Sequence, residues 1–127
     1  MNTKELQLVT FEQARRLRAI GFDWFCEYYY NEGDIKNLVK FYCRNHSNSF
    51  QNSTPTVALA LKWFRDVKGI IANIGYDVWL EPLEINFIGS CYLENGRRYI
   101  NIGKFDTYED AESALLDKLL NILEKKQ

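Results

Sequence analysis

The segment from residue 54 to residue 69 constrains the fold most, because it is the best-specified helix in the sequence. Thr54 is predicted to be its N-cap, and Pro55 suits the first helical position because proline has no N–H to leave unpaired. Gly69 is predicted to end the helix. Apolar residues recur between these ends in two neighbouring rows at helical spacing, namely Val57, Leu59, Ala60, Leu61, Trp63, Phe64 and Val67. We expect a core helix that lies beneath a sheet or between two elements.

The first part of the chain predicts a short helix followed by a hairpin. Thr10 and Gln13 have the spacing of a capping box, so a helix is expected from residue 11 to residue 20, with Gly21 as its left-handed cap. Aromatic and β-branched residues at 24–30 and 38–43 predict two paired strands. The polar stretch 44–53 is expected to be a long loop.

The later part predicts a strand over 70–80 and a second hairpin with strands at 85–94 and 97–105. Asn95 and Gly96 favour a two-residue type I′ turn between those strands, and such a turn fixes the register of the pairs. The predicted pairs are Glu94 with Arg97, Tyr92 with Tyr99, Cys91 with Ile100, Ser90 with Asn101, and Gly89 with Ile102.

A last helix is expected from residue 108 to residue 124, with Asp106 or Thr107 as its N-cap. The sequence therefore predicts one α+β domain spanning residues 1–127, in the order α-β-β-α-β-β-β-α. The sheet is expected to be mainly antiparallel, with the helices packed on one face. Whether the two hairpin regions share one sheet is left open by the sequence.

Composition excludes some classes of partner. The chain has 16 Lys and Arg against 17 Asp and Glu. It therefore lacks the positive net charge that attracts a protein to nucleic acid or to an anionic membrane. No apolar stretch approaches the roughly 18 residues that a membrane span needs, and the N-terminus has no signal-like run. We expect a cytoplasmic protein without a membrane partner, with Cys26, Cys43 and Cys91 as buried free thiols.

Residues with catalytic potential are few. The sequence holds no Walker loop, dinucleotide fingerprint, zinc-protease helix or nucleophile elbow. Cys43 and His46 have a Cys-x-x-His spacing, but a metal would need a further ligand, so a core thiol and a loop histidine are expected. Glu81 and Glu84 flank Pro82 and are expected to be exposed turn charges. The prediction is a non-enzyme with no catalytic residue, no metal and no cofactor.

Three stretches of the sequence together resemble a family of small uncharacterised proteins from gut-bacterial genomes and their phages. They are residues 9–22 with 26–30, residues 53–65, and residues 105–111. That family has no assigned activity. The resemblance implies a phage or mobile-element background and carries no functional residue over to this chain.

A second likeness is topological. The order helix, three strands, helix over residues 55–124 is similar to double-stranded-RNA-binding domains, which place a lysine cluster at the start of the last helix. This sequence has Glu109, Asp110 and Glu112 there. Residues 103–111 also resemble the strand-to-helix join of integrase arm-binding modules, and that likeness implies phosphate or base contacts from Arg97, Arg98 and Lys104.

The leading functional prediction is a non-catalytic binding or accessory module with an unidentified protein partner. The alternatives are nucleic-acid binding and a self-associating structural protein. The predicted docking face is the side of the second hairpin that carries Tyr92, Tyr99, Ser90 and Asn101, flanked by Arg97. A competing interpretation is that the two tyrosines only stabilise the hairpin, by roughly 0.2–1 kcal/mol.

Overall fold

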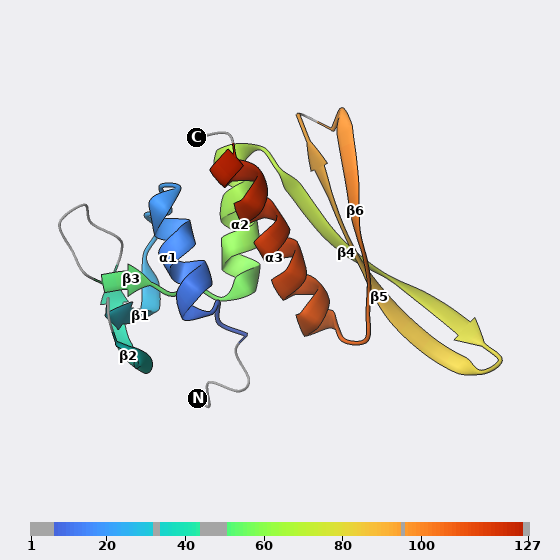
Figure 1. Ribbon diagram of the computed structural model, residues 1–127, viewed down its shortest axis with the longest axis horizontal. Coiled ribbons are helices and arrows are strands. Elements are labelled where there is room, and N and C mark those ends of the chain that lie inside the picture. The colour runs from blue at the N-terminus through green and yellow to red at the C-terminus, as the bar shows by residue number, and fades with distance from the viewer. Residues whose placement is uncertain (1–6, 32–33, 44–50, 95, 126–127) are drawn as a thin grey trace. The chain divides into compact units, whose positions relative to one another are not determined.

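The computed structural model describes residues 7–31, 34–43, 51–94 and 96–125. The chain forms two compact units, one made of residues 1–57 with 120–127 and the other of residues 58–119. Each unit contains a three-stranded antiparallel sheet (Figure 1). The predicted α+β class and element order are confirmed, with one short strand added. The two hairpin regions thus belong to separate sheets. The expectation of a single domain stays a prediction.

The first unit opens with α1 (Phe11–Ala19), and both of its predicted ends are confirmed. Thr10 Oγ1 accepts a hydrogen bond from the Gln13 N–H at 3.1 Å, and the Thr10 N–H donates to Gln13 Oε1 at 3.0 Å. These two bonds form the capping box. At the other end Gly21 has φ +102°, and the Phe22 N–H donates to the Leu17 carbonyl at 3.0 Å.

The sheet of this unit has the order β2-β1-β3, built from β1 (Cys26–Asn31), β2 (Asp34–Cys43) and β3 (Gln51–Ser53). The predicted hairpin is confirmed. The expected loop over 44–53 is wrong at its C-terminal end, because Tyr29 pairs with Ser53 and Asn31 with Gln51. The free edge of β1 offers unpaired backbone groups, and β3 satisfies them although its sequence is polar. The rest of that predicted loop, 44–50, lies outside the described residues.

Helix α2 spans Val57–Lys68, so the predicted cap at Thr54 is wrong. Residues 54 and 55 precede the helix: the Thr54 N–H donates to the Tyr28 carbonyl at 2.8 Å, and the Pro55 carbonyl accepts from the Val9 N–H at 3.0 Å. The bond to Val9 occupies the Pro55 carbonyl, which a helix that starts there would use as an acceptor, so the helix begins later. Its predicted end is confirmed, since Gly69 has φ +68° and the Ile70 N–H donates to the Phe64 carbonyl at 3.1 Å.

The second unit contains a sheet of order β4-β5-β6, formed by β4 (Ile71–Leu80), β5 (Leu83–Leu93) and β6 (Arg98–Phe105). Helix α2 and helix α3 (Tyr108–Lys125) lie on one face of this sheet (Figure 1). Thr107 Oγ1 accepts from the Asp110 N–H at 3.1 Å, so Thr107 and not Asp106 is the N-cap of α3. From residue 120 onward α3 belongs to the first unit.

The predicted register of the second hairpin is confirmed near the turn and wrong farther from it. Tyr92 pairs with Tyr99, Cys91 with Ile100 and Ser90 with Asn101, but Gly89 pairs with Gly103. Ile102 is therefore an extra residue on β6, which makes a β-bulge. At the turn the Arg97 N–H donates to the Glu94 carbonyl at 3.3 Å; Asn95, and with it the predicted turn type, lies outside the described residues.

Three local features explain the bulge. Gly103 has φ +114°, a conformation that side chains disfavour. Asn101 Oδ1 accepts a hydrogen bond from the Gly103 N–H at 2.8 Å. On the facing strand a Cβ added to Gly89 would lie 2.7 Å from Ile102 Cδ1 and 3.7 Å from the Ala111 carbonyl oxygen of α3. The missing side chain of Gly89 thus makes room for both Ile102 and the close approach of α3.

Candidate functional site

The outer face of the β4-β5-β6 sheet carries the predicted tyrosine pair. Ile71, Tyr92 and Tyr99 are directly paired across the strands, and their exposed fractions run from 39% for Tyr92 to 53% for Tyr99. The two tyrosine rings have centroids 5.1 Å apart. Tyr92 and Tyr99, the aromatic part of the predicted docking face, thus remain open to solvent.

The polar residues of the predicted docking face, Ser90 and Asn101, are less available to a partner than the two tyrosines. Ser90, a small residue on the central strand between Asn73 and Asn101, is buried. Asn101 is exposed, but its carboxamide oxygen holds the Gly103 N–H of the bulge. Sequence reasoning placed these side chains on the correct face without detecting that neighbouring strands and the bulge engage them.

The three predicted cationic contacts do not gather on one face of the sheet. Arg98 pairs with Leu93 and so lies on the helix-facing side, whereas the bulge turns Lys104 to the outer side, where it pairs with Ile88. Lys104 Nζ lies 3.4 Å from Asp77 Oδ2. Arg97 is exposed in the turn beyond them. Without the bulge Arg98 and Lys104 would share a face, as their even spacing predicts.

A different surface of the same sheet exposes more apolar area. The last pair of β5 with β6 is Phe87 with Phe105, so beyond the pair of Tyr76 with Phe87 strands β4 and β5 continue as a two-stranded hairpin (Figure 1). Residues 76–86, which include Tyr76 at the base of this hairpin, are here called the arm. One face of the arm is wholly uncharged and its exposed fractions run from 41% for Val78 to 78% for Leu80. We call this set the arm face: Tyr76, Val78, Leu80, Leu83 and Ile85.

The arm face continues the core face of the sheet. Because strand residues alternate between faces, Leu83 and Ile85 point to the same side as Cys91 and Leu93, which are buried. Over that buried part lies α3, whose Tyr108 packs edge-on against Phe87 with ring centroids 6.0 Å apart. Helix α3 begins at Tyr108. Residues of the arm beyond Phe87 therefore carry a core-like pattern without the helix that covers the rest.

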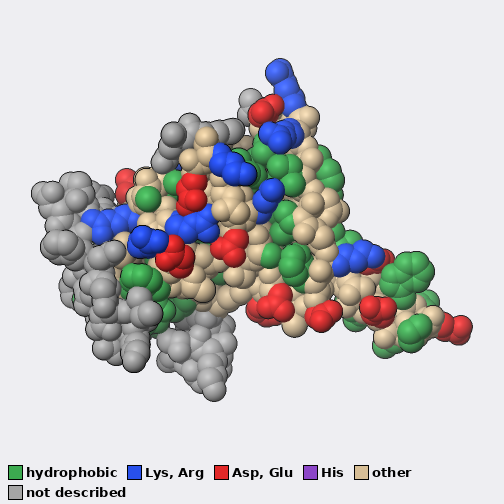
Figure 2. Space-filling model, viewed as in Figure 1, with side chains coloured by type: hydrophobic (Ala, Val, Ile, Leu, Met, Phe, Trp, Pro, Cys, Tyr) green, Lys and Arg blue, Asp and Glu red, His purple; other side chains and the backbone are tan. Residues whose placement is uncertain are grey.

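The other face and the tip of the arm are acidic and aromatic. Asp77, Trp79, Glu84 and Asn86 alternate with the arm-face residues, and Glu81 lies in the turn. Figure 2 shows hydrophobic side chains beside acidic ones at this end of the sheet. The arm thus has one apolar face and one face that suits water, except for the exposed Trp79.

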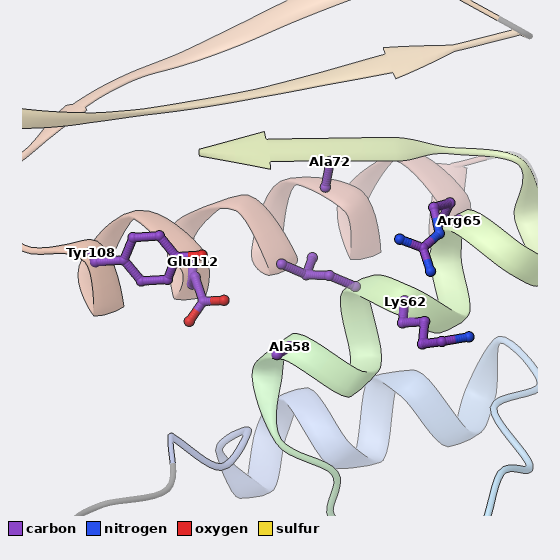
Figure 3. Close-up of a pocket in the computed structure, with 7 residues that line it drawn as sticks. Ala58, Lys62, Arg65, Ala72, Tyr108 and Glu112 are labelled. Carbon is purple, nitrogen blue, oxygen red and sulfur yellow. The ribbon is translucent and has the colours of Figure 1, made fainter. Parts of the chain in front are cut away.

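A small pocket of about 240 Å³ lies between α2, β4 and α3 in the second unit (Figure 3). Its charged lining consists of Lys62 and Arg65 from α2 and Glu112 from α3. Both cations pair with Asp66, and their hydrogen bonds hold the pKa of the Asp66 carboxyl below its ordinary value. The remaining lining residues are Ala58, Leu61, Ala72 and Tyr108.

Sequence reasoning named Glu112 only as part of the acidic start of the last helix and did not predict its burial. The residue is only 8% exposed, and the pKa of its carboxyl is raised, first by burial and then by the charge of Glu109. The pKa of the neighbouring Tyr108 phenol is also raised, first by burial and then by the charges of Glu112 and Glu109. Glu112 stands three, four and seven residues before Leu115, Leu116 and Leu119, so the helical period itself places it on the apolar stripe.

Those residues weighed for catalysis that the structure describes do not line this pocket. Glu81 and Glu84 are exposed on the arm. His46 and the side chain of Cys43 lie outside the described residues. Cys26 and Cys91 are free and buried, and burial raises the pKa of the Cys91 thiol, which makes the thiol a poor nucleophile. Among the described residues, no group of three or more His, Cys, Asp or Glu side chains could hold a metal ion.

Comparisons with known proteins give no further assignment. No family model matches the chain, and no curated protein or solved structure matches it. The resemblance to phage and gut-bacterial proteins therefore stays a prediction. Over the described ranges, none of the helices combines the length and apolar character needed to cross a membrane.

Proposed function

We propose that the chain is a non-catalytic protein-binding module that docks its partner on the arm face. The observation that carries this proposal is the exposure of Tyr76, Val78, Leu80, Leu83 and Ile85 on one side of a two-stranded extension. Apolar side chains scattered singly are normal on a protein surface, but a contiguous uncharged set is typical of an interaction site.

The size of the arm face suits a protein partner. An aromatic side chain such as that of Tyr76 buries about 150–250 Å², and the smaller Val, Leu and Ile side chains bury less, so the exposed fractions give roughly 500 Å² for the set. Standard protein interfaces bury about 800 Å² on each partner. The arm face is thus smaller than one side of a standard interface, and its side chains are exposed, whereas those of a small-molecule site line a concave pocket.

The setting of this function follows the sequence-based predictions. The buried free thiols Cys26 and Cys91 support a cytoplasmic location. The resemblance to gut-bacterial and phage proteins supports a role in a phage or mobile element. The outer row of Tyr92 and Tyr99 is a second surface that a partner could contact. Nucleic-acid binding is the weaker alternative, since Arg98 and Lys104 lie on opposite faces and Lys104 pairs with Asp77.

Site-specific photo-crosslinking tests the proposal. A photoreactive amino acid at position 80 is expected to form a discrete covalent adduct with a protein, either another protein of the source cell or a second copy of this chain. The matched control carries the same group at position 79, which is exposed on the opposite face of the same strand. A protein adduct from position 80 but not from 79 supports the proposal. No protein adduct from position 80, or equal adducts from both positions, would overturn it.

A further inference from the structure

We propose that the partner that covers the arm face is a second copy of this chain. Two arms would pack face to face through Tyr76, Val78, Leu80, Leu83 and Ile85 of each copy. This inference rests on the proposed function, because it names the partner of the same surface.

Charge is the first reason for choosing a second copy. A two-fold dimer uses the same patch on both subunits, so every charge in the patch meets a patch of its own sign. The arm face contains no charged residue. Asp77 and Glu84 alternate onto the opposite face, and Glu81 lies in the turn. Self-association on this face therefore brings no like charges into direct opposition within the packed rows.

The available area is the second reason. Two arm faces of roughly 500 Å² bury roughly 1,000 Å² together, which is about the smallest area of a biological interface and less than the roughly 1,200–2,000 Å² of specific, stable ones. The arms alone thus suit a weak, reversible dimer. Pairing of the two Trp79 faces would place Asp77 and Glu84 of one copy against the same carboxylates of the other, so the apolar faces are preferred.

Sheet geometry is the third reason. Two β-sheets pack with their faces about 10 Å apart and their side chains interdigitated. If the two arms point in opposite directions, the tip of each arm packs on the base of the other. Leu80 and Leu83 at the tip then meet the base, where Tyr76 and Phe87 are paired. Each copy then supplies the apolar layer that α3 supplies along the rest of the same sheet face.

Sedimentation velocity of the purified full chain over a range of concentrations tests the inference. The wild-type chain is expected to dimerise, and Leu80→Glu is expected to raise the dimer dissociation constant by more than about tenfold, because it buries an unpaired carboxylate in both halves of the interface. Leu80→Thr, which suits a strand, is expected to shift the constant in the same direction by less. The matched control Trp79→Glu lies on the opposite face and is expected to leave the constant unchanged.

The outcomes separate this inference from the proposed function. Leu80 is exposed, so Leu80→Glu and Leu80→Thr are expected to keep the wild-type circular dichroism spectrum. A wild-type chain that stays monomeric while position 80 crosslinks to another protein would overturn the second-copy inference and leave the proposed function standing. A dimer that Leu80→Glu and Trp79→Glu affect equally, or not at all, would also overturn it. Higher salt is expected not to weaken the dimer, because no ion pair holds the two arm faces together.

Discussion

The rings of Tyr92 and Tyr99 lie side by side on the outer face of the sheet, with centroids 5.1 Å apart and planes inclined by 51°. The two residues occupy directly opposite positions on β5 and β6. Their pairing fixes which side of each strand faces α3, because Cys91 and Ile100, one position away, then point to the helices.

Replacing both tyrosines by Thr tests what the pair contributes. We expect the Tyr92→Thr, Tyr99→Thr double variant to keep its fold, since threonine suits a strand. A double-mutant cycle on the free energy of unfolding is expected to show a coupling of about 0.2–1 kcal/mol between the two rings. A coupling of zero would contradict a stabilising ring pair.

The same double variant separates structure from binding once a partner is identified by crosslinking. An affinity equal to that of the wild type, with lowered thermal stability, leaves the tyrosine pair a structural role only. A lower affinity at unchanged stability would extend the docking surface to the outer face of the sheet.

Gly89→Ala tests the bulge. The added Cβ would lie 2.7 Å from Ile102 Cδ1 and 2.8 Å from Ile102 Cγ1, so the Ile102 side chain must move. We expect the free energy of unfolding to fall by about 1–3 kcal/mol, as overpacking does in other cores. In urea titrations the loss is expected to be smaller when Ile102→Ala is already present.

Gly75→Ala is the matched control for the bulge prediction, because a Cβ at Gly75 meets no atom within 4 Å. This variant is expected to be neutral or slightly stabilising, since alanine reduces the freedom of the unfolded chain. Equal losses at Gly75 and Gly89 would contradict the steric account of the bulge.

Glu112 predicts a dependence of stability on pH. The folded chain raises the pKa of this carboxyl above its ordinary value of 4.5, so at a pH between the ordinary and the raised pKa the folded state binds a proton that the unfolded state has released. The free energy of unfolding therefore falls as the pH rises from the ordinary pKa of the carboxyl to its raised pKa in the folded chain. We expect Glu112→Gln to be more stable than the wild type at pH 7, and the difference to shrink as pH falls below 4.5.

Urea titrations between acidic and neutral pH measure the effect of Glu112. The groups that line the same pocket with it are Lys62, Arg65 and Tyr108. Glu109→Gln, which removes an exposed neighbouring carboxylate, is the control and is expected to have a smaller effect. Loss of stability in Glu112→Gln at pH 7 would show instead that the folded chain stabilises the ionised carboxylate.

The arrangement of the cations predicts weak interaction with nucleic acid. Since Arg98 and Lys104 lie on opposite faces of the sheet, we expect the chain to leave the mobility of a labelled duplex unchanged even at low salt. A shift that weakens steeply with salt, and that Arg97→Ala and Arg98→Ala reduce, would instead support the nucleic-acid alternative.

Local signals in the sequence predict much of the fold. The capping box at Thr10 and the left-handed glycines 21 and 69 lie within a few residues of the hydrogen bonds that they determine. The pairing of Tyr92 with Tyr99 follows from a turn only a few residues away. In each case the interacting groups are neighbours in the sequence, so the pattern contains the information.

Features that depend on distant groups could not be predicted in this way. The late start of α2 depends on the hydrogen bonds of Thr54 and Pro55 to Tyr28 and Val9. The bulge at Ile102 depends on the missing side chain of Gly89. Alternation over Tyr76, Val78 and Leu80 predicts an apolar face for the strand. It does not tell whether a helix of the same chain covers that face, which is the fact on which the proposed docking site depends.

Intermolecular nuclear Overhauser effects in a mixture of isotope-labelled and unlabelled chain test the central claim most directly. At concentrations where sedimentation detects the dimer, the account predicts cross-peaks from the methyl groups of Leu80 and Leu83 in one copy to the ring protons of Tyr76 in the other. Trp79, on the opposite face of the arm, is predicted to show none. Intermolecular cross-peaks confined to Trp79 or to other surfaces, or their complete absence, would contradict the claim that the arm faces cover each other.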